Sequence, residues 1–191
     1  MERAYKLEFA GERAGSLYVS CCGLSKTEPL HSFGPAQKPY YLIHYILRGK
    51  GRFSLRNKEF QLSSGNGFLI PPEELSFYQA DEKEPWTYIW VGFQGEMAER
   101  ILQNIGLTVV NPVFCSDHSE ELYQAVKDMM EHNTYGISND LRRNGQLQVF
   151  LSLIADGVTI QEHGEVDRAD HYVERAIAYI RSNYCNPIRV T

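Results

Sequence analysis

Tyr40–Leu47 is written YYLIHYIL, Gly49-Lys50-Gly51 follows it, and Thr87–Phe93 is written TYIWVGF. Short runs of aromatic and β-branched residues such as these are typical of buried strands. Other strand candidates lie around them, bounded by Gly, Pro, Asn and Ser: Ser16–Cys22, Arg52–Leu55, Glu59–Leu62, Phe68–Ile70 and Leu75–Ala80. Strands at spacings of roughly 8 to 12 residues predict an antiparallel sandwich or barrel, with Gly49-Lys50-Gly51 as a hairpin turn.

After Gln94 the pattern becomes helical. Apolar residues recur at helical spacing in four segments: 95–105, 116–132, 139–158 and 168–184. The polar stretch 161–167 has no such pattern and is a predicted linker. The sequence therefore predicts a mainly β plus α chain, with an N-terminal arm and barrel in 1–93, helices in 94–160, and a further helix within 168–191.

Composition excludes several classes of protein. The 191 residues are 43% hydrophobic and 23% charged, as in an ordinary globular chain, and the net charge of −5 argues against a compact nucleic-acid binder. The sequence has no run of 18 apolar residues and no apolar signal region at its start, so we expect a cytoplasmic protein with no membrane contact. The four cysteines form no CxxC pair, and we expect free thiols.

Several segments together carry a family resemblance. They are HSFGP at His31–Pro35, YLIHYIL at Tyr41–Leu47, the following GKG, FLIPPEE at Phe68–Glu74 and PWTYIWVGF at Pro85–Phe93. In this order and spacing they resemble the ligand-binding half of AraC-type bacterial transcription regulators. The segment 168–191, ending in IRVT, resembles the opening of that family's DNA-binding domain, which has two helix-turn-helix motifs.

The resemblance implies a fold and a function. The fold is a cupin-like antiparallel barrel of jelly-roll type followed by helices. The function is that of an effector-sensing and dimerising domain rather than an enzyme, with a small-molecule effector, expected to be a sugar or oligosaccharide, inside the barrel. DNA would be bound only by the missing C-terminal domain, and the partner would be a second copy of the chain.

Metal ligands are missing where the fold would place them. Many cupins bind a metal with His and Glu side chains, and the corresponding positions here are Lys38, Tyr40, Leu42 and Ser76. A transition-metal site needs imidazole, carboxylate or thiolate ligands, so we expect no metal and no cofactor. The alternative function is a metal-free cupin enzyme of the sugar isomerase or epimerase type, which would have no use for the helix in 168–191.

Strand alternation predicts which residues face the barrel interior. With Lys38, Tyr40 and Leu42 inward, His44 and Ile46 also point inward. The predicted ligand-binding residues are Tyr40, His44, Ser76, Tyr78, Tyr88 and Trp90. The resemblance implies the same for Tyr78, Tyr88 and Trp90, although Tyr88 replaces a family His and the family's sugar-binding Arg falls near Gly34. Aromatic faces stack on sugar rings, but the same rings could instead fill a small barrel as core.

An apolar stripe in 139–158 also has two interpretations. Its members are Leu147, Phe150, Leu151 and Ile154. The stripe could pack on the barrel as core, or it could pair with its copy in a second subunit as the dimerisation surface, as the family's dimers do. One helix can serve both purposes on adjacent faces.

Overall fold

The computed structural model describes residues 3–9 and 16–157 and contains two antiparallel sheets. The larger sheet has the strand order β1-β2-β9-β4-β7-β10, and its strands are β1 Arg3–Glu8, β2 Tyr18–Lys26, β9 Thr87–Gln94, β4 Tyr41–Arg48, β7 Asn66–Ile70 and β10 Val113–Cys115. The smaller sheet has the order β3-β8-β5-β6, with β3 Ser32–Ala36, β8 Ser76–Ala80, β5 Lys50–Leu55 and β6 Lys58–Ser63. The sheets face each other as a cupin-like barrel of jelly-roll type.

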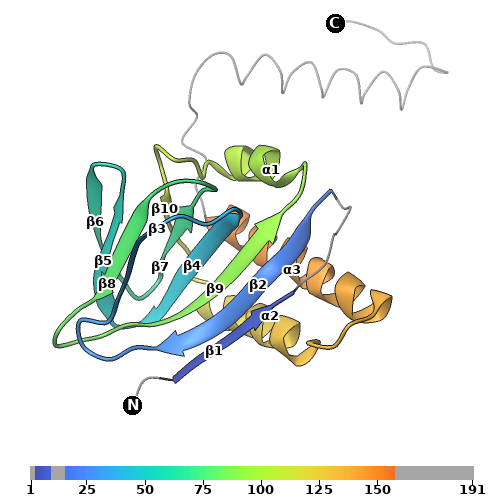
Figure 1. Ribbon diagram of the computed structural model, residues 1–191, viewed down its shortest axis with the longest axis horizontal. Coiled ribbons are helices and arrows are strands. Elements are labelled where there is room, and N and C mark those ends of the chain that lie inside the picture. The colour runs from blue at the N-terminus through green and yellow to red at the C-terminus, as the bar shows by residue number, and fades with distance from the viewer. Residues whose placement is uncertain (1–2, 10–15, 158–191) are drawn as a thin grey trace, which may run out of the picture. The chain divides into compact units, whose positions relative to one another are not determined.

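Three helices complete the described chain: α1 Ala98–Ile105, α2 Ser119–Glu131 and α3 Ile137–Gly157. Helices α2 and α3 lie behind the larger sheet, across β2, β4 and β9 (Figure 1). None of the described helices is long and apolar enough to cross a membrane. The linker predicted at 161–167 and the helix predicted within 168–191 lie outside the described residues.

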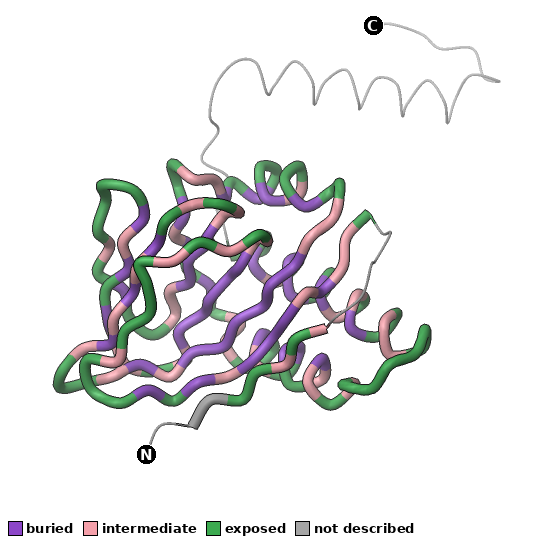
Figure 2. The backbone as a smooth tube through the Cα atoms, viewed as in Figure 1, coloured by how far each residue is buried: buried purple, intermediate pink, exposed green. Residues whose placement is uncertain are grey.

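Each face of the larger sheet has its own core, as strand alternation predicts. Ile43, Tyr45, Ile89 and Val91 point outward and pack with the buried residues of the helices. Leu42, Ile46, Tyr88 and Trp90 point inward and pack with residues of the smaller sheet. Figure 2 shows that burial is densest along the middle strands between these two cores.

The apolar stripe of α3 belongs to the outer core. Leu147, Phe150, Leu151 and Ile154 are all buried within the single chain. Strand β10 comes from the predicted helical region and pairs with β7, so residues 94–157 share one packed unit with the barrel.

Most predicted elements form close to their predicted ends, but three strands were not predicted. Strands β1, β3 and β10 are the additions, and each lies at an edge of its sheet. Gly49 forms the predicted hairpin turn with φ of 77°, and Lys50 and Gly51 already belong to β5. Some Gly-rich GxG segments bind phosphate at the start of a helix. This GxG segment joins two strands and begins no helix, so it has no structural basis for phosphate binding.

Candidate functional site

The six predicted ligand-binding residues come from three parts of the barrel. Tyr40 precedes β4 and His44 lies within it, Ser76 and Tyr78 lie on β8, and Tyr88 and Trp90 lie on β9. The structure brings their aromatic rings together inside the barrel, since all of them except Tyr40 are buried and Tyr40 packs against the same cluster.

His44 is at the centre of this cluster. Its imidazole stacks on Phe68 with ring centroids 4.6 Å apart and lies 5.0 Å from Tyr78 and 5.2 Å from Tyr88. Burial among these rings lowers the pKa of His44 to about 3, so the imidazole is neutral at pH 7. Nδ1 of His44 is buried and has no hydrogen-bond partner among the described residues.

Three tyrosines belong to the same interior as the imidazole. The rings of Tyr78 and Tyr88 lie 6.0 Å apart, and burial together with the neighbouring Tyr88 raises the pKa of Tyr78. Tyr40 and the thiol of Cys21 both lie beside Gly92, and burial, with the neighbouring Cys21, raises the pKa of Tyr40 as well. Tyr40 and Tyr78 therefore remain protonated, and their hydroxyls can donate or accept hydrogen bonds.

Gly23 and Gly92 make room for the rings of Trp90 and Tyr40. A Cβ on Gly23 would come within 2.3 Å of Cζ2 of Trp90, and a Cβ on Gly92 would come within 2.9 Å of Cε2 of Tyr40. Both glycines face inward, so each ring lies against bare backbone of the larger sheet. Glycine in a strand often marks such a close approach. The missing side chains of the two glycines thus leave room for these rings on the inner face of the sheet.

Sequence reasoning missed other residues of this interior. Ser25 Oγ and Trp86 Nε1 are buried without a hydrogen-bond partner among the described residues, and Trp86 lies 6.0 Å from Tyr88. Phe33, which is 37% exposed, stacks on Tyr78 at 5.5 Å. Alternation from Trp90 back through Tyr88 could have identified Trp86, but no pattern in the sequence indicates Phe33.

The positions aligned with metal ligands have other contacts. Ser76 is buried, and its hydroxyl donates a long hydrogen bond of 3.4 Å to the carbonyl of Ala36. Lys38 has its ammonium 5.0 Å from the ring of Phe33. The part of the chain that the structure describes contains no group of three or more His, Cys, Asp or Glu side chains that could hold a metal ion.

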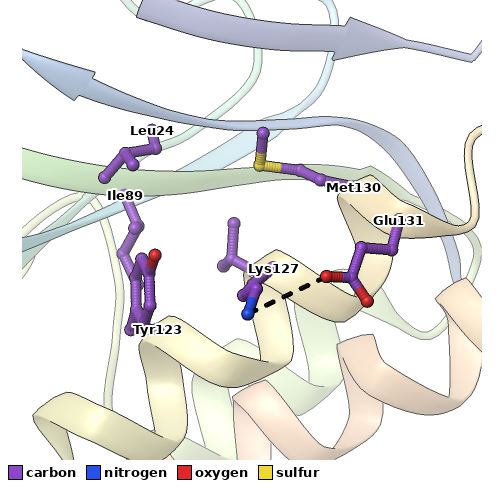
Figure 3. A pocket seen from close by; sticks show the side chains of 7 residues that line it. Leu24, Ile89, Tyr123, Lys127, Met130 and Glu131 are labelled. Atoms are coloured by element: carbon purple, nitrogen blue, oxygen red, sulfur yellow. Dashed lines mark ion pairs between the residues drawn. The ribbon is translucent and has the colours of Figure 1, made fainter.

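Two surface hollows lie away from this cluster. One, of about 190 Å³, lies between α2 and the outer face of the larger sheet (Figure 3). It is lined by Leu24, Ile89, Tyr123 and Met130, with the ion pair Lys127–Glu131 at its rim. The second, of about 410 Å³, lies along α2 and α3 and is lined mostly by polar side chains. Neither has the combination of aromatic faces and buried polar atoms found inside the barrel.

Comparison with known proteins agrees with this architecture. The family described as the AraC-like ligand binding domain matches residues 18–151. The chain belongs to this family. Because the match extends from β2 into α3, the AraC-like domain includes both the barrel and the helices packed on it.

Three curated relatives of this AraC-like domain regulate operons. The Msm operon regulatory protein of Streptococcus mutans serotype c is 32% identical over 91% of the chain and 63% of the relative. The raffinose operon transcriptional regulatory protein RafR of Pediococcus pentosaceus is 26% identical over 75% and 53%. The lactose operon transcription activator of Staphylococcus xylosus is 21% identical over 88% and 61%. The chain therefore spans 53–63% of the length of these relatives.

Solved structures are also similar to part of the AraC-like domain. YhaK of Escherichia coli has a TM-score of 0.43 and 16% identity, covering 49% of this chain and 45% of its own. A Cupin 2 conserved barrel domain protein of Salinispora arenicola has a TM-score of 0.40 and 16% identity, covering 52% and 81%.

Proposed function

We propose that this AraC-like domain binds a neutral sugar or oligosaccharide inside its barrel and so controls DNA binding by a C-terminal domain of the full-length regulator. The observation that carries the proposal is the neutral, buried imidazole of His44, whose Nδ1 has no partner among the described residues and lies among aromatic rings. Buried polar atoms are normally hydrogen-bonded, so such an atom marks a place where a ligand hydroxyl gains a bond.

The surrounding groups support a sugar as the ligand. The rings of Trp90 and Tyr40 lie against Gly23 and Gly92, aromatic faces suit stacking against the C–H face of a sugar, and the tyrosine hydroxyls suit its hydroxyl groups. The buried polar and charged side chains of the described chain include no carboxylate, and the buried Arg143 lies on α3. The names of two relatives refer to raffinose and lactose operons, which agrees with this class.

Homodimerisation and a cytoplasmic location belong to the same proposal. The predicted stripe Leu147, Phe150, Leu151 and Ile154 is buried against the barrel, so a second subunit would contact the opposite side of α3. That side carries Leu141 and Val149, which are 65% and 46% exposed. A dimer would place two DNA-binding domains on paired half-sites.

An isomerase or epimerase function has less support. Such an enzyme needs a general base whose pKa lies near the working pH. Burial lowers the pKa of His44 to about 3, which makes its imidazole a weak base at the centre of the site. A binding role requires only that the imidazole donate or accept a hydrogen bond.

A thermal-shift screen tests the proposal directly. The chain is heated with lactose, raffinose, galactose and glucose, each over a range of concentrations. A sugar at 100 times its dissociation constant should stabilise the fold by about 2.7 kcal/mol. No shift with any sugar, confirmed by calorimetry, would refute sugar binding. Loss of the shift in the variant Trp90→Phe would assign the binding to the barrel.

A further inference from the structure

Strand β1 places two charged residues on the inner face of the larger sheet. It pairs with β2 so that Lys6 is opposite Gly23 and Glu8 is opposite Cys21. Directly paired residues of antiparallel strands project on the same face. Cys21 belongs to the inner core, so Lys6 and Glu8 lie on the inner face. Leu7, between them, packs against the outer core.

The two charged residues lie in neighbouring rows: Lys6 is opposite Gly23, against which Trp90 lies, and Glu8 is opposite Cys21, which lies beside Tyr40 at Gly92. Lys6 and Glu8 form an ion pair, and their side chains are 45% and 66% exposed. The hydrogen bond and charge of Lys6 lower the pKa of Glu8, and Lys38 acts in the same direction. The carboxylate of Glu8 in turn contributes to the raised pKa of Tyr40. The strand register places Glu8 in the row of Cys21 and Tyr40, and the ion pair holds the ammonium of Lys6 next to Glu8.

The interior and the rim differ in a way that suits two sugar rings. Trp90 lies over Gly23 in an enclosed part of the barrel, while Tyr40 lies over Gly92 and is half-buried. A ring stacked on Trp90 is within reach of the neutral donors and acceptors of the interior. A second ring would lie beside Tyr40, where charged groups form stronger hydrogen bonds to hydroxyls than neutral groups do.

We infer that Lys6, Glu8 and Tyr40 form an outer subsite for the second ring of a neutral disaccharide or longer saccharide, whose first ring stacks on Trp90. The inference rests on the proposed sugar-binding function. Because Lys6 and Glu8 neutralise each other, the outer subsite favours an uncharged ring with hydroxyls over a phosphorylated or acidic one.

The experiment compares two-ring and one-ring sugars by titration calorimetry. Lactose, raffinose and galactose are titrated into the wild-type chain and into the variants Lys6→Met and Glu8→Gln. Each variant should weaken lactose or raffinose binding about ten-fold and change galactose binding less than about two-fold, because the one-ring sugar does not reach the rim. The variants Lys127→Met and Glu131→Gln are the matched control, since they change a similarly exposed ion pair on α2.

The outcomes separate this inference from the proposed function. The outer subsite would be overturned if the wild-type chain bound galactose as tightly as the larger sugars. It would also be overturned if Lys6→Met and Glu8→Gln weakened the binding of galactose as much as that of lactose and raffinose. Both results would leave sugar binding in place. Unchanged binding of lactose and raffinose in both variants would overturn the outer subsite as well. Failure of every sugar to bind the wild-type chain would refute the proposed function itself.

Discussion

The imidazole of His44 links protonation to unfolding. Its pKa is about 3 in the folded chain and about 6.5 when exposed, so the unfolded chain takes up a proton first as the pH falls. With respect to this group, the free energy of unfolding has its full value above pH 6.5 and decreases progressively as the pH falls to about 3. We expect a loss of about 2 kcal/mol from this group between pH 7 and 5.

Replacement of His44 by Phe should remove that pH dependence. Phe keeps the stack on Phe68 but cannot take up a proton, so the free energy of unfolding in urea should vary less between pH 7 and 5 than in the wild-type chain. The variant His118→Gln, which changes an exposed imidazole, is the control. If the free energy of unfolding of His44→Phe varied with pH as much as that of the wild-type chain, the low pKa assigned to His44 would be contradicted.

Substitutions of Trp90 and Tyr78 test whether these rings line a ligand pocket or only fill the core. Trp90→Ala should cost about 3–5 kcal/mol of stability, because a buried ring is removed. Trp90→Phe should retain most packing while weakening sugar binding. Tyr78→Phe removes only a buried hydroxyl beside Tyr88 and should cost about 0.5–1.5 kcal/mol of stability. If both Phe variants lower the melting temperature with no change in sugar affinity, the rings are core.

At the scale of elements, two glycines should respond in opposite ways to the same substitution. Gly23→Ala in β2 places a methyl group 2.3 Å from Trp90 and from the carbonyl oxygen of Tyr5, which should displace the ring and β1 and cost about 1–3 kcal/mol. Gly145→Ala in α3 meets nothing within 4 Å and should add about 0.5–1 kcal/mol through helix propensity. Chemical denaturation of both variants measures the difference, and equal effects would contradict the geometry.

The sequence predicted the central strands better than the edges. The apolar runs that became β4 and β9 are buried on both faces, so their composition alone identifies them. β1, β3 and β10 are edge strands with fewer apolar residues, and their pairing with distant neighbours stabilises them more than local propensity does. Strand β3 contains Gly34 and Pro35, which favour a turn when the sequence is considered alone.

The same difference applies to the candidate site. Alternation along β4, β8 and β9 predicted the inward face of His44, Tyr78 and Trp90 without any structure. It could not identify Lys6, Glu8 or Phe33, because they face the site only through the register of edge strands. The contact between Trp90 and Gly23 depends on the pairing of β2 with β9, which the residue pattern of a single strand does not reveal.

For the whole molecule, substitutions on the buried and exposed sides of α3 separate effects on folding from effects on self-association. Leu147→Ala removes a fully buried side chain and should cost about 2–5 kcal/mol of stability at any protein concentration. Leu141→Glu and Val149→Glu change exposed positions and should alter the sedimentation coefficient without lowering the melting temperature of the monomer. A dimer that persists in both charged variants would place the contact on another face.

Arg143 joins the N-terminal strand to the helical layer. Its side chain on α3 is buried, its guanidinium carbon lies 4.2 Å from the ring centroid of Phe9, and it donates a hydrogen bond to the carbonyl of His132. Phe9 directly follows Glu8, so one short segment contacts both the rim of the barrel and α3. By thermodynamic linkage, any ligand that holds this segment in place also favours the packing around Arg143, and a change in that packing alters ligand affinity by the same coupling free energy.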